Sequence, residues 1–240
     1  MKTLLITGTT SGIGEALAHF YANQGWQVCA CGRNQEKLNS LASEFNNITP
    51  LSFDVTNKQE VEKAASQLSE KLDLVILNAG TCEYINNPMK FDSDLFERVI
   101  NTNLISIGYC LEFLLPQIKP GGRIAFMSSS ASYLPLPRAA AYGASKAALN
   151  YVADTLRIEL QKFDISVSLI CPGFVETPLT DKNQFSMPMR ITSKEAAEII
   201  ASGIANRKDH IDFPRLFMLI LRFLSFLPKG LWRRLAKRMA

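Results

Sequence analysis

The chain has 240 residues, of which 47% are hydrophobic and 20% charged, a composition that fits one large α/β domain or two small ones. The net charge is +4, and neither His19 nor His210 stands at ligand spacing from a second His or Cys, which argues against zinc and any other metal centre. The five cysteines form no CxxC pair, and a strand pattern begins at Lys2 with no room for a signal peptide. We therefore expect reduced thiols in a cytoplasmic protein.

A strand over residues 2–7, a glycine-rich turn and a helix open the chain. The glycine spacing is G-x-x-x-G-x-G, which is neither the G-x-G-x-x-G fingerprint nor a P-loop. Such a turn presents backbone N–H groups and a helix N-terminus to a phosphate. The alternative is an ordinary tight turn. We predict that the pyrophosphate of a dinucleotide binds at Gly8, Thr10, Ser11, Gly12, Ile13 and Gly14.

Residues 27–31 predict a second strand, followed directly by Gly32 and Arg33. The end of this strand faces the adenosine ribose in a dinucleotide fold, where an acidic residue would repel a 2′-phosphate. Gly32 leaves space instead, and a guanidinium pairs with phosphate in a bidentate way. Arg33 thus favours NADP(H), although NAD(H) stays open, as does the alternative that Arg33 is a plain surface charge.

Two further strands end in candidate cofactor residues. Residues 49–55 predict a strand whose Asp54 has two possible roles, an acceptor for the adenine amino group or a cap for a helix near Asn57. The apolar run 72–77 predicts a central strand of a parallel sheet, followed by small residues where the backbone approaches something flat. The predicted cofactor contacts here are Asp54, Val55, Asn78, Ala79 and Gly80.

A long helical pattern from Asp94 to about residue 115 carries Asn101 and Asn103. Asparagine is unfavourable inside a helix, so the pattern indicates either a kink with a polar task or a solvated face. A fifth strand then leads to Ser128 and Ser129.

Tyr142 and Lys146 are four residues apart at the start of a helix, so the phenol and the ammonium share one face. A lysine nearby favours the phenolate, and the tyrosine can then transfer a proton at working pH. Ser129 lies where it can hydrogen-bond a substrate oxygen beside the tyrosine. The alternative is a purely structural role: a helical tyrosine with an exposed lysine and a serine-rich turn.

The sixth strand covers residues 164–171. An irregular stretch over 179–192 resembles a short lid, and Ser193 is expected to cap the next helix. The alternation of strands and helices predicts a doubly wound parallel sheet, a three-layer α/β/α Rossmann fold with its ligand at the carboxyl ends of the strands. The residues that follow the sixth strand and complete the predicted cofactor site are Pro172, Gly173, Val175 and Thr177.

Together these motifs resemble the short-chain dehydrogenase/reductase superfamily in its single-domain form, over residues 3 to about 178. The resemblance implies that Tyr142 is the acid/base and that Ser129 orients the substrate oxygen. Lys146 would lower the pKa of the tyrosine and bind the nicotinamide ribose. The resemblance further implies a water held by Asn103 in a proton relay, a carboxamide contact from Thr177, adenine binding by Asp54, and a homodimer or homotetramer.

The chain departs from the family pattern in two places. Ser132 stands where a glycine often follows the catalytic serine, and the closing strand near the C-terminus is either absent or reduced to residues 211–214. We therefore expect one NAD(P)-binding domain over residues 1–240, with a core of 1–206 and an extension of 207–240. The extension carries a net charge of +7, so the rest of the chain carries −3.

The extension permits two readings. Residues 213–227 are apolar but interrupted by Arg215 and Arg222, and they fall short of the ~20 residues of a membrane span. In the first interpretation, the tail packs over the substrate pocket and a partner subunit. In the second, it is an interfacial helix that binds anionic lipid. The last segment alternates apolar and basic residues, namely Leu231, Trp232, Arg233, Arg234, Leu235, Lys237, Arg238 and Met239.

The leading hypothesis is an NADP(H)-dependent oxidoreductase for the carbonyl or alcohol carbon of a small or lipophilic substrate. The alternative is a non-catalytic dinucleotide-binding or scaffold protein on the same fold. A serine hydrolase is a third idea, because the residues around Ser145 approach G-x-S-x-G, but they follow no strand and lack the last glycine.

Overall fold

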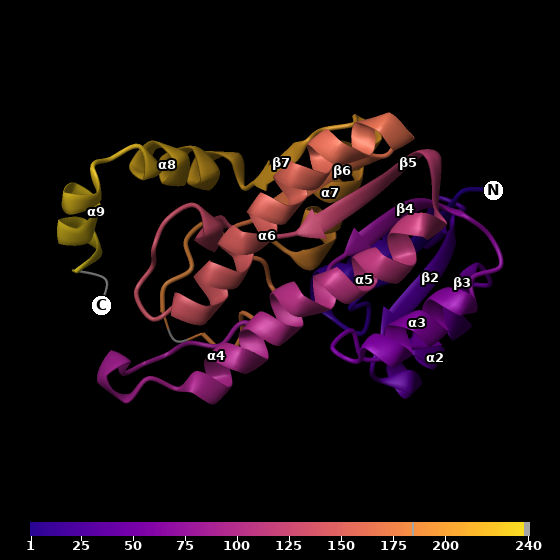
Figure 1. Ribbon diagram of the computed structural model, residues 1–240, viewed down its shortest axis with the longest axis horizontal. Helices are drawn as coiled ribbons and strands as arrows, with labels where there is room; N and C mark the ends of the chain where they lie inside the picture. Colours follow the sequence, from indigo (N-terminus) through magenta and orange to yellow (C-terminus); the bar gives the residue numbers. More distant parts are fainter. Residues whose placement is uncertain (184, 238–240) are drawn as a thin grey trace.

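The computed structural model describes residues 1–183 and 185–237, and it is built around one seven-stranded sheet (Figure 1). The strand order is β3-β2-β1-β4-β5-β6-β7, and every neighbouring pair is parallel. The order reverses between β1 and β4, which places the ligand site of such a sheet at the carboxyl ends there. The predicted doubly wound parallel sheet is confirmed. The strands are β1 (Thr3–Thr7), β2 (Gln27–Gly32), β3 (Ile48–Ser52), β4 (Leu72–Leu77), β5 (Ile118–Met127), β6 (Ser166–Pro172) and β7 (His210–Phe213).

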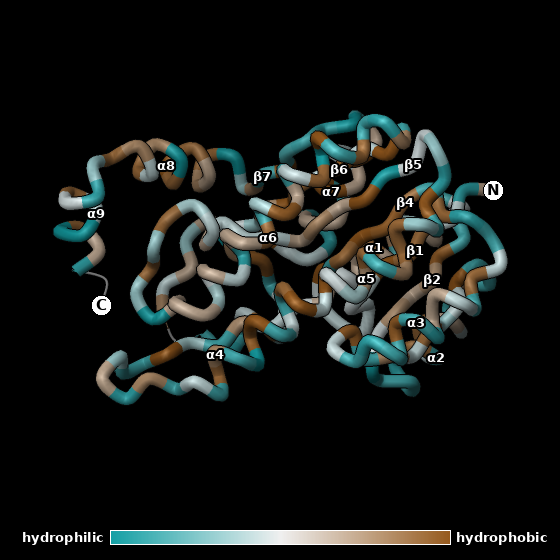
Figure 2. Tube along the Cα trace, in the orientation of Figure 1, coloured by the Kyte–Doolittle hydropathy of each residue, from teal (hydrophilic) through white to brown (hydrophobic). Residues whose placement is uncertain are grey.

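Helices cover both faces of the sheet and bury alternate strand residues. In β1, Leu5 faces one apolar cluster while Leu4 and Ile6 face the other, as the two-residue period of a strand requires. Hydrophobic residues therefore follow the strands through the middle of the molecule (Figure 2). One face is covered by α3 (Lys58–Ser66), α5 (Ser106–Leu114) and α6 (Ala140–Glu159), and the other by α1 (Gly12–Asn23), α2 (Gln35–Glu44) and α7 (Ser193–Ala205).

A π-helical turn, Asn101–Ile105, interrupts the long helical segment between α4 (Ser93–Ile100) and α5. The segment Ser93–Gln117 is long and apolar enough to cross a membrane, but α5 packs its apolar side on the sheet as a core helix. The wider turn leaves the side chain of Asn103 fully buried, at 0% exposure. The prediction of a kink with a polar task is confirmed, and the solvated face is wrong.

Two helix starts differ from the sequence prediction. Helix α7 is capped by Thr192 rather than Ser193, because Thr192 and Glu195 form a reciprocal capping box. Ser193 is the first helical residue. Helix α3 is capped by Asn57, so Asp54 does not cap it; the side chain of Asp54 lines the cleft and accepts from Thr56 and Arg33.

The C-terminal region begins with the short edge strand β7, which belongs to the sheet although it falls beyond the predicted core boundary at residue 206. The helices α8 (Arg215–Ser225) and α9 (Lys229–Ala236) follow β7 and extend beyond the sheet (Figure 1). Trp232 is buried and donates from Nε1 to the carbonyl oxygen of Pro135 at 3.0 Å. The tail therefore packs on its own chain at Pro135, a contact that favours neither of the two interpretations of the extension. Arg238 and Met239 of that prediction lie outside the described residues.

Candidate functional site

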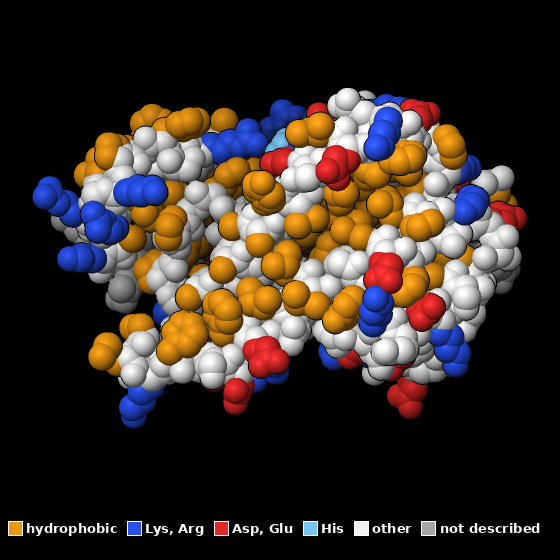
Figure 3. All heavy atoms as spheres, viewed as in Figure 1, with side chains coloured by type: hydrophobic (Ala, Val, Ile, Leu, Met, Phe, Trp, Pro, Cys, Tyr) orange, Lys and Arg blue, Asp and Glu red, His pale blue; other side chains and the backbone are white. Residues whose placement is uncertain are grey.

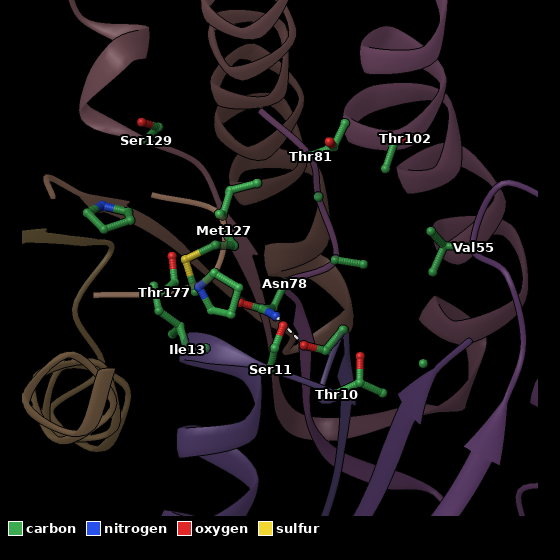
Figure 4. A pocket seen from close by; sticks show the side chains of 18 of the residues that line it. Thr10, Ser11, Ile13, Val55, Asn78, Thr81, Thr102, Met127, Ser129 and Thr177 are labelled. Carbon is green, nitrogen blue, oxygen red and sulfur yellow. Dashed lines mark hydrogen bonds between the residues drawn. The ribbon is translucent and has the colours of Figure 1, made fainter. Parts of the chain in front are cut away.

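A cleft of about 320 Å³ opens at the carboxyl ends of the strands (Figure 4). Most of the predicted site residues line it: Gly8, Thr10, Ser11, Gly12, Ile13, Arg33, Asp54, Val55, Asn78, Ala79, Gly80, Ser129, Tyr142, Lys146, Pro172, Gly173, Val175 and Thr177. Gly14 and Asn103 are not lining residues and lie behind its wall. Half of the lining residues absent from the predicted site carry hydroxyls, namely Thr56, Thr81, Thr102, Ser128 and Thr180, and the others are Gly32, Phe53, Met127, Pro178 and Leu179.

The glycine loop has a backbone that side chains would not permit. Gly8 and Gly12 have positive φ angles of +74° and +61°. A Cβ at Gly14 would lie 2.0 Å from the carbonyl oxygen of Gly8, so α1 packs against the loop only because no side chain is present. The side chain of Asn78 donates to the carbonyl oxygens of Thr7 and Gly8, each at 3.0 Å, and ties the loop to β4.

The N-terminus of α1 points its backbone N–H groups at the cleft. Ser11 is the N-cap residue, and within residues 1–183 and 185–237 its side chain makes no capping hydrogen bond. Free N–H groups and the positive end of the helix dipole form a site for an anion. The loop from Gly8 to Ile13 therefore fits the pyrophosphate of a dinucleotide.

At the β2 and β3 end of the cleft, charged side chains stand in or near solvent. The side chain of Arg33 is 79% exposed, and its Nη1 lies 3.4 Å from Oδ2 of Asp54. Burial acts to raise the pKa of Asp54, but hydrogen bonds from Thr56 and the charge of Arg33 outweigh it and hold this pKa below its usual value. The exposed guanidinium of Arg33 and the carboxylate of Asp54 are the charged groups at this end of the cleft.

At the other end of the cleft, Ser129 follows β5 and Tyr142 and Lys146 lie in the first turns of α6. Lys146 is only 4% exposed, and its Nζ donates to the carbonyl oxygen of Met127 at 2.8 Å. Burial lowers the pKa of Lys146 to about 8. Its ammonium lies 5.9 Å from the centroid of the Tyr142 ring, so the two side chains are neighbours at the start of α6.

The phenol of Tyr142 behaves differently from the electrostatic prediction. Burial raises its pKa, while a hydrogen bond with Ser129 acts in the opposite direction and does not prevail. The protein by itself therefore keeps this hydroxyl protonated, and a lowered pKa is not what the surrounding chain produces. The sequence could not indicate this, because the pKa depends on how deeply α6 places the ring.

Asn103 does not line the cleft but forms hydrogen bonds with residues that position its wall. Its Oδ1 accepts from the backbone N–H of Thr81 at 2.8 Å, and its Nδ2 donates to the carbonyl oxygen of Thr81 and to Oγ of Ser145. Ser145 in turn donates to the carbonyl oxygen of Tyr142 at 2.7 Å. The asparagine thus connects the loop after β4 with the first turn of α6. Ser145 is fully buried in this network, so the serine hydrolase idea is wrong.

Ser132, the departure from the family pattern, belongs to a second network. Its hydroxyl donates to the carbonyl oxygen of Ser129 at 2.6 Å and accepts from Nδ2 of Asn150 at 2.9 Å. The oxygen of the same Asn150 side chain accepts from Ser128. This serine therefore links the turn that carries Ser129 to the middle of α6.

An aromatic cluster, Tyr84, Phe174, Phe185 and Phe217, extends from the cleft toward the tail. Phe185 lies 5.7 Å from Tyr84 and 6.1 Å from Phe174, measured between ring centroids. Phe174 lies 5.5 Å from Phe217 of α8, which also contacts the lining residue Gly173. These residues come from four separate segments, so no local sequence pattern could have brought them together.

Comparison with known proteins now identifies the chain. A model of the short chain dehydrogenase family matches residues 2–187. The chain belongs to this family. It is 32% identical to an uncharacterized oxidoreductase of Myxococcus xanthus, over 99% of this chain and 97% of that protein. It is also 32% identical to a 3beta-hydroxysteroid dehydrogenase of Mediterraneibacter gnavus, over 84% of this chain and 74% of that protein.

Solved structures share the fold over nearly the whole chain. A short chain dehydrogenase from Burkholderia cenocepacia, in complex with NADP, superposes with a TM-score of 0.86 at 24% identity, covering 98% of this chain and 99% of that one. A serine dehydrogenase complexed with NADP+ gives a TM-score of 0.80 at 25% identity, covering 88% and 94%. As a short-chain dehydrogenase, the protein is an NAD(P)-dependent oxidoreductase of CH–OH and C=O groups, which confirms the predicted class of enzyme.

Proposed function

We propose that the protein is an NADP(H)-dependent reductase or dehydrogenase that uses Tyr142 as its acid/base. One observation carries the proposal: the hydroxyls of Ser129 and Tyr142 meet beside the buried Lys146, in the same cleft that holds the glycine loop. A non-catalytic scaffold would have no need of this buried arrangement, which costs stability because it desolvates an ammonium group.

The chain's own residues suffice to hold and orient the cofactor. The N–H groups between Gly8 and Ile13 would bind the pyrophosphate, and Asp54 would accept from the adenine amino group. Gly80 approaches both Asn103 and Lys146 closely, since a Cβ there would lie 3.1 Å and 3.4 Å from their polar atoms. A side chain at this point of the floor would press on Asn103 and Lys146. A bound nicotinamide would supply the hydride in reduction and accept it in oxidation.

The raised pKa of Tyr142 suits the role of proton donor. In reduction its hydroxyl would give the proton to the carbonyl oxygen, and in oxidation its phenolate would take the proton from the alcohol. Ser129 would hold the same substrate oxygen through its hydroxyl. With a pKa of about 8, Lys146 is mostly charged at neutral pH and would stabilise the phenolate as it forms.

The preference for NADP(H) rests on the end of β2. The end of β2 continues as Gly32, Arg33 and Asn34. This segment would place a cation next to the ribose, and it contains no Asp or Glu. A side chain at Gly32 would collide with Thr10 at 2.7 Å, which keeps the guanidinium side of the cleft open. The NADP+ complex of the serine dehydrogenase supports the same preference.

A lipophilic substrate is supported by the aromatic cluster. Its four rings extend outward from Gly173, beside the end of the cleft that holds Ser129 and Tyr142. Aromatic walls favour apolar ligands because they gain contact area without losing hydrogen bonds to water. The relative that acts as a 3beta-hydroxysteroid dehydrogenase supports the same class.

We also propose that the whole chain forms one dinucleotide-binding unit that works as a cytoplasmic homo-oligomer. The five cysteines are free thiols, which fits a reducing compartment. The apolar side chains of Tyr151 and Ile158 are exposed on α6, which fits a face covered by another copy.

The test is a screen of the purified protein with NADPH and a panel of ketones and aldehydes of increasing apolar area. We expect NADPH consumption with at least one apolar ketone, and a rate lower by about 10²-fold or more with Tyr142→Phe at equal cofactor occupancy. Tight cofactor binding without turnover on any member of the panel, in the unmodified protein, would support the scaffold alternative instead.

A further inference from the structure

Helix α8 is apolar on two opposite sides. Met218 and Leu221 are buried against the protein, while a second apolar stripe faces outward. Phe223 is 70% exposed and Phe226 86% exposed, so neither side chain contributes much to folding. A surface helix normally keeps its outer side polar, and a contiguous exposed apolar patch marks an interaction site. The outward residues are Leu216, Leu219, Ile220, Phe223 and Phe226, continued on α9 by Leu231 and Leu235.

The charges around this stripe are all of one sign. The sequence contains no Asp or Glu from residue 213 to its end. Arg222 pairs with Asp212 of β7, whereas the other cations of α8 and α9 are exposed. Lys and Arg side chains lie next to the apolar side chains over α8 and α9 in the space-filling view (Figure 3). The exposed cations are Arg215, Lys229, Arg233, Arg234 and Lys237.

The sign of the charge decides between the possible partners. A second copy docked through the same face would bring two strongly basic tails together, and like charges repel. An anionic lipid surface complements both properties, because acyl chains take the apolar stripe and headgroups take the cations. Helices of 11 and 8 residues are too short to span a bilayer, so they would lie in its surface.

A second exposed segment lies at the same end of the molecule as α8 and α9. Met89 is 91% exposed, and its neighbours Lys90 and Phe91 are also exposed. This loop precedes α4 and lies at the same end of the molecule's long axis as α8 and α9 (Figure 1). Apolar and basic side chains thus project from two separate segments at one end.

We propose that this end of the molecule, formed by α8, α9 and residues 88–91, docks on anionic lipid membranes. The inner side of α8 carries Phe217, which contacts Gly173 at the cleft and packs against Phe174 with the two rings tilted by 49°. The docking face and the cleft wall are therefore two sides of one helix. If the proposed function holds, an apolar substrate dissolved in the membrane reaches the cleft along the aromatic cluster.

The experiment is co-sedimentation of the full chain with vesicles, which needs neither cofactor nor turnover. It can therefore fail while the oxidoreductase proposal stands, and the reverse also holds. We expect binding to vesicles that mix phosphatidylcholine with phosphatidylglycerol, little binding to phosphatidylcholine alone, and loss of binding at high salt.

Two variants at exposed positions test the two halves of the proposal. Arg233→Gln combined with Arg234→Gln should weaken binding about fivefold for each removed cation. Phe223→Ser should weaken it about tenfold or more, because a phenyl ring no longer enters the lipid. The matched controls are Lys37→Gln with Lys63→Gln, on α2 and α3, and Phe163→Ser after α6, which should bind like the unmodified chain.

Three outcomes would overturn the proposal. The first is absence of binding to anionic vesicles at low salt by a correctly folded chain. The second is a lipid-free dimer that Phe223→Ser converts to monomer, which would assign the face to a second copy. The third is binding to poly-glutamate without binding to vesicles, which would assign it to an acidic protein.

Discussion

The two ends of the cleft are built from opposite kinds of contacts. Around Tyr142 the polar groups are buried, hydrogen-bonded and fixed through Asn103 and Lys146 to three different elements. Around Arg33 the charges stand in solvent, and the guanidinium meets a single carboxylate at 3.4 Å. Buried networks are sensitive to every missing partner, whereas exposed pairs tolerate change. We therefore expect the first end to govern turnover and the second to govern which cofactor is chosen.

The largest expected effect is at the buried end. Tyr142→Phe keeps the ring packed in α6 but removes the hydroxyl that moves the proton. We expect turnover to fall by about 10²-fold or more, with the dissociation constant of NADPH almost unchanged. Steady-state rates on the best ketone of the panel, with cofactor titration by fluorescence, measure both quantities. Near-normal turnover with cofactor bound would remove Tyr142 from the mechanism.

The pKa of Lys146 reports how far the end of the cleft around Tyr142 is shielded from water. The pKa of Lys146 in the folded protein is about 8, below the ordinary lysine value of 10.5 that applies in the unfolded chain. At a pH between these two pKa values, the unfolded chain binds the proton and the folded chain does not. Stability of the unmodified protein should therefore rise with pH in this window, relative to Lys146→Met. We expect the difference in unfolding free energy to shift by about 2–3 kcal/mol between pH 7 and pH 10.

Denaturant unfolding of both proteins at the two pH values gives this shift, and other titrating groups cancel in the difference. A difference that does not change with pH would show that Lys146 is solvated, and the contrast between the two ends would then fail.

At the exposed end, Arg33→Ala should change selectivity and leave the chemistry intact. We expect NADPH binding to weaken about tenfold and NADH binding to stay the same, since an exposed charge-assisted contact contributes about 1.5 kcal/mol. Added salt should reduce the difference between the two proteins. Equal affinity of the unmodified chain for NADH and NADPH would contradict the preference for the phosphorylated cofactor.

The smallest effect is expected at Ser132, which supports the buried end without touching the cleft chemistry. Ser132→Gly removes the hydroxyl that connects Ser129 with Asn150 and leaves the amide of Asn150 without its acceptor. We expect a loss of about 1 kcal/mol of stability and a drop of a few-fold in kcat with KM unchanged. An unchanged kcat would mean that the turn at Ser129 is held by other contacts.

Local sequence patterns predicted the parts of the fold that local chemistry determines. The glycines of the first turn, the Tyr142/Lys146 spacing and the alternation of strands and helices each follow from backbone geometry within a few residues. They were sufficient for the sheet and for most of the cleft lining.

The rest depended on contacts between distant segments. The burial of Asn103 follows from a π-helical turn that periodicity cannot reveal, and the pKa of Tyr142 follows from its surroundings. The contact of Phe217 with Phe174 joins α8 to the loop after β6. The cap of α7 at Thr192 was missed because Ser193 beside it is an equally good capping residue.

The most direct test of the account compares Tyr142→Phe and Arg33→Ala in one single-turnover experiment with preloaded NADPH. We predict that Tyr142→Phe slows the chemical step by about 10²-fold at unchanged NADPH affinity. Arg33→Ala should weaken NADPH affinity and leave the rate of the chemical step at saturating NADPH unchanged. A slowed chemical step in Arg33→Ala, or weakened NADPH affinity with a normal step in Tyr142→Phe, would contradict the division of labour between the two ends of the cleft.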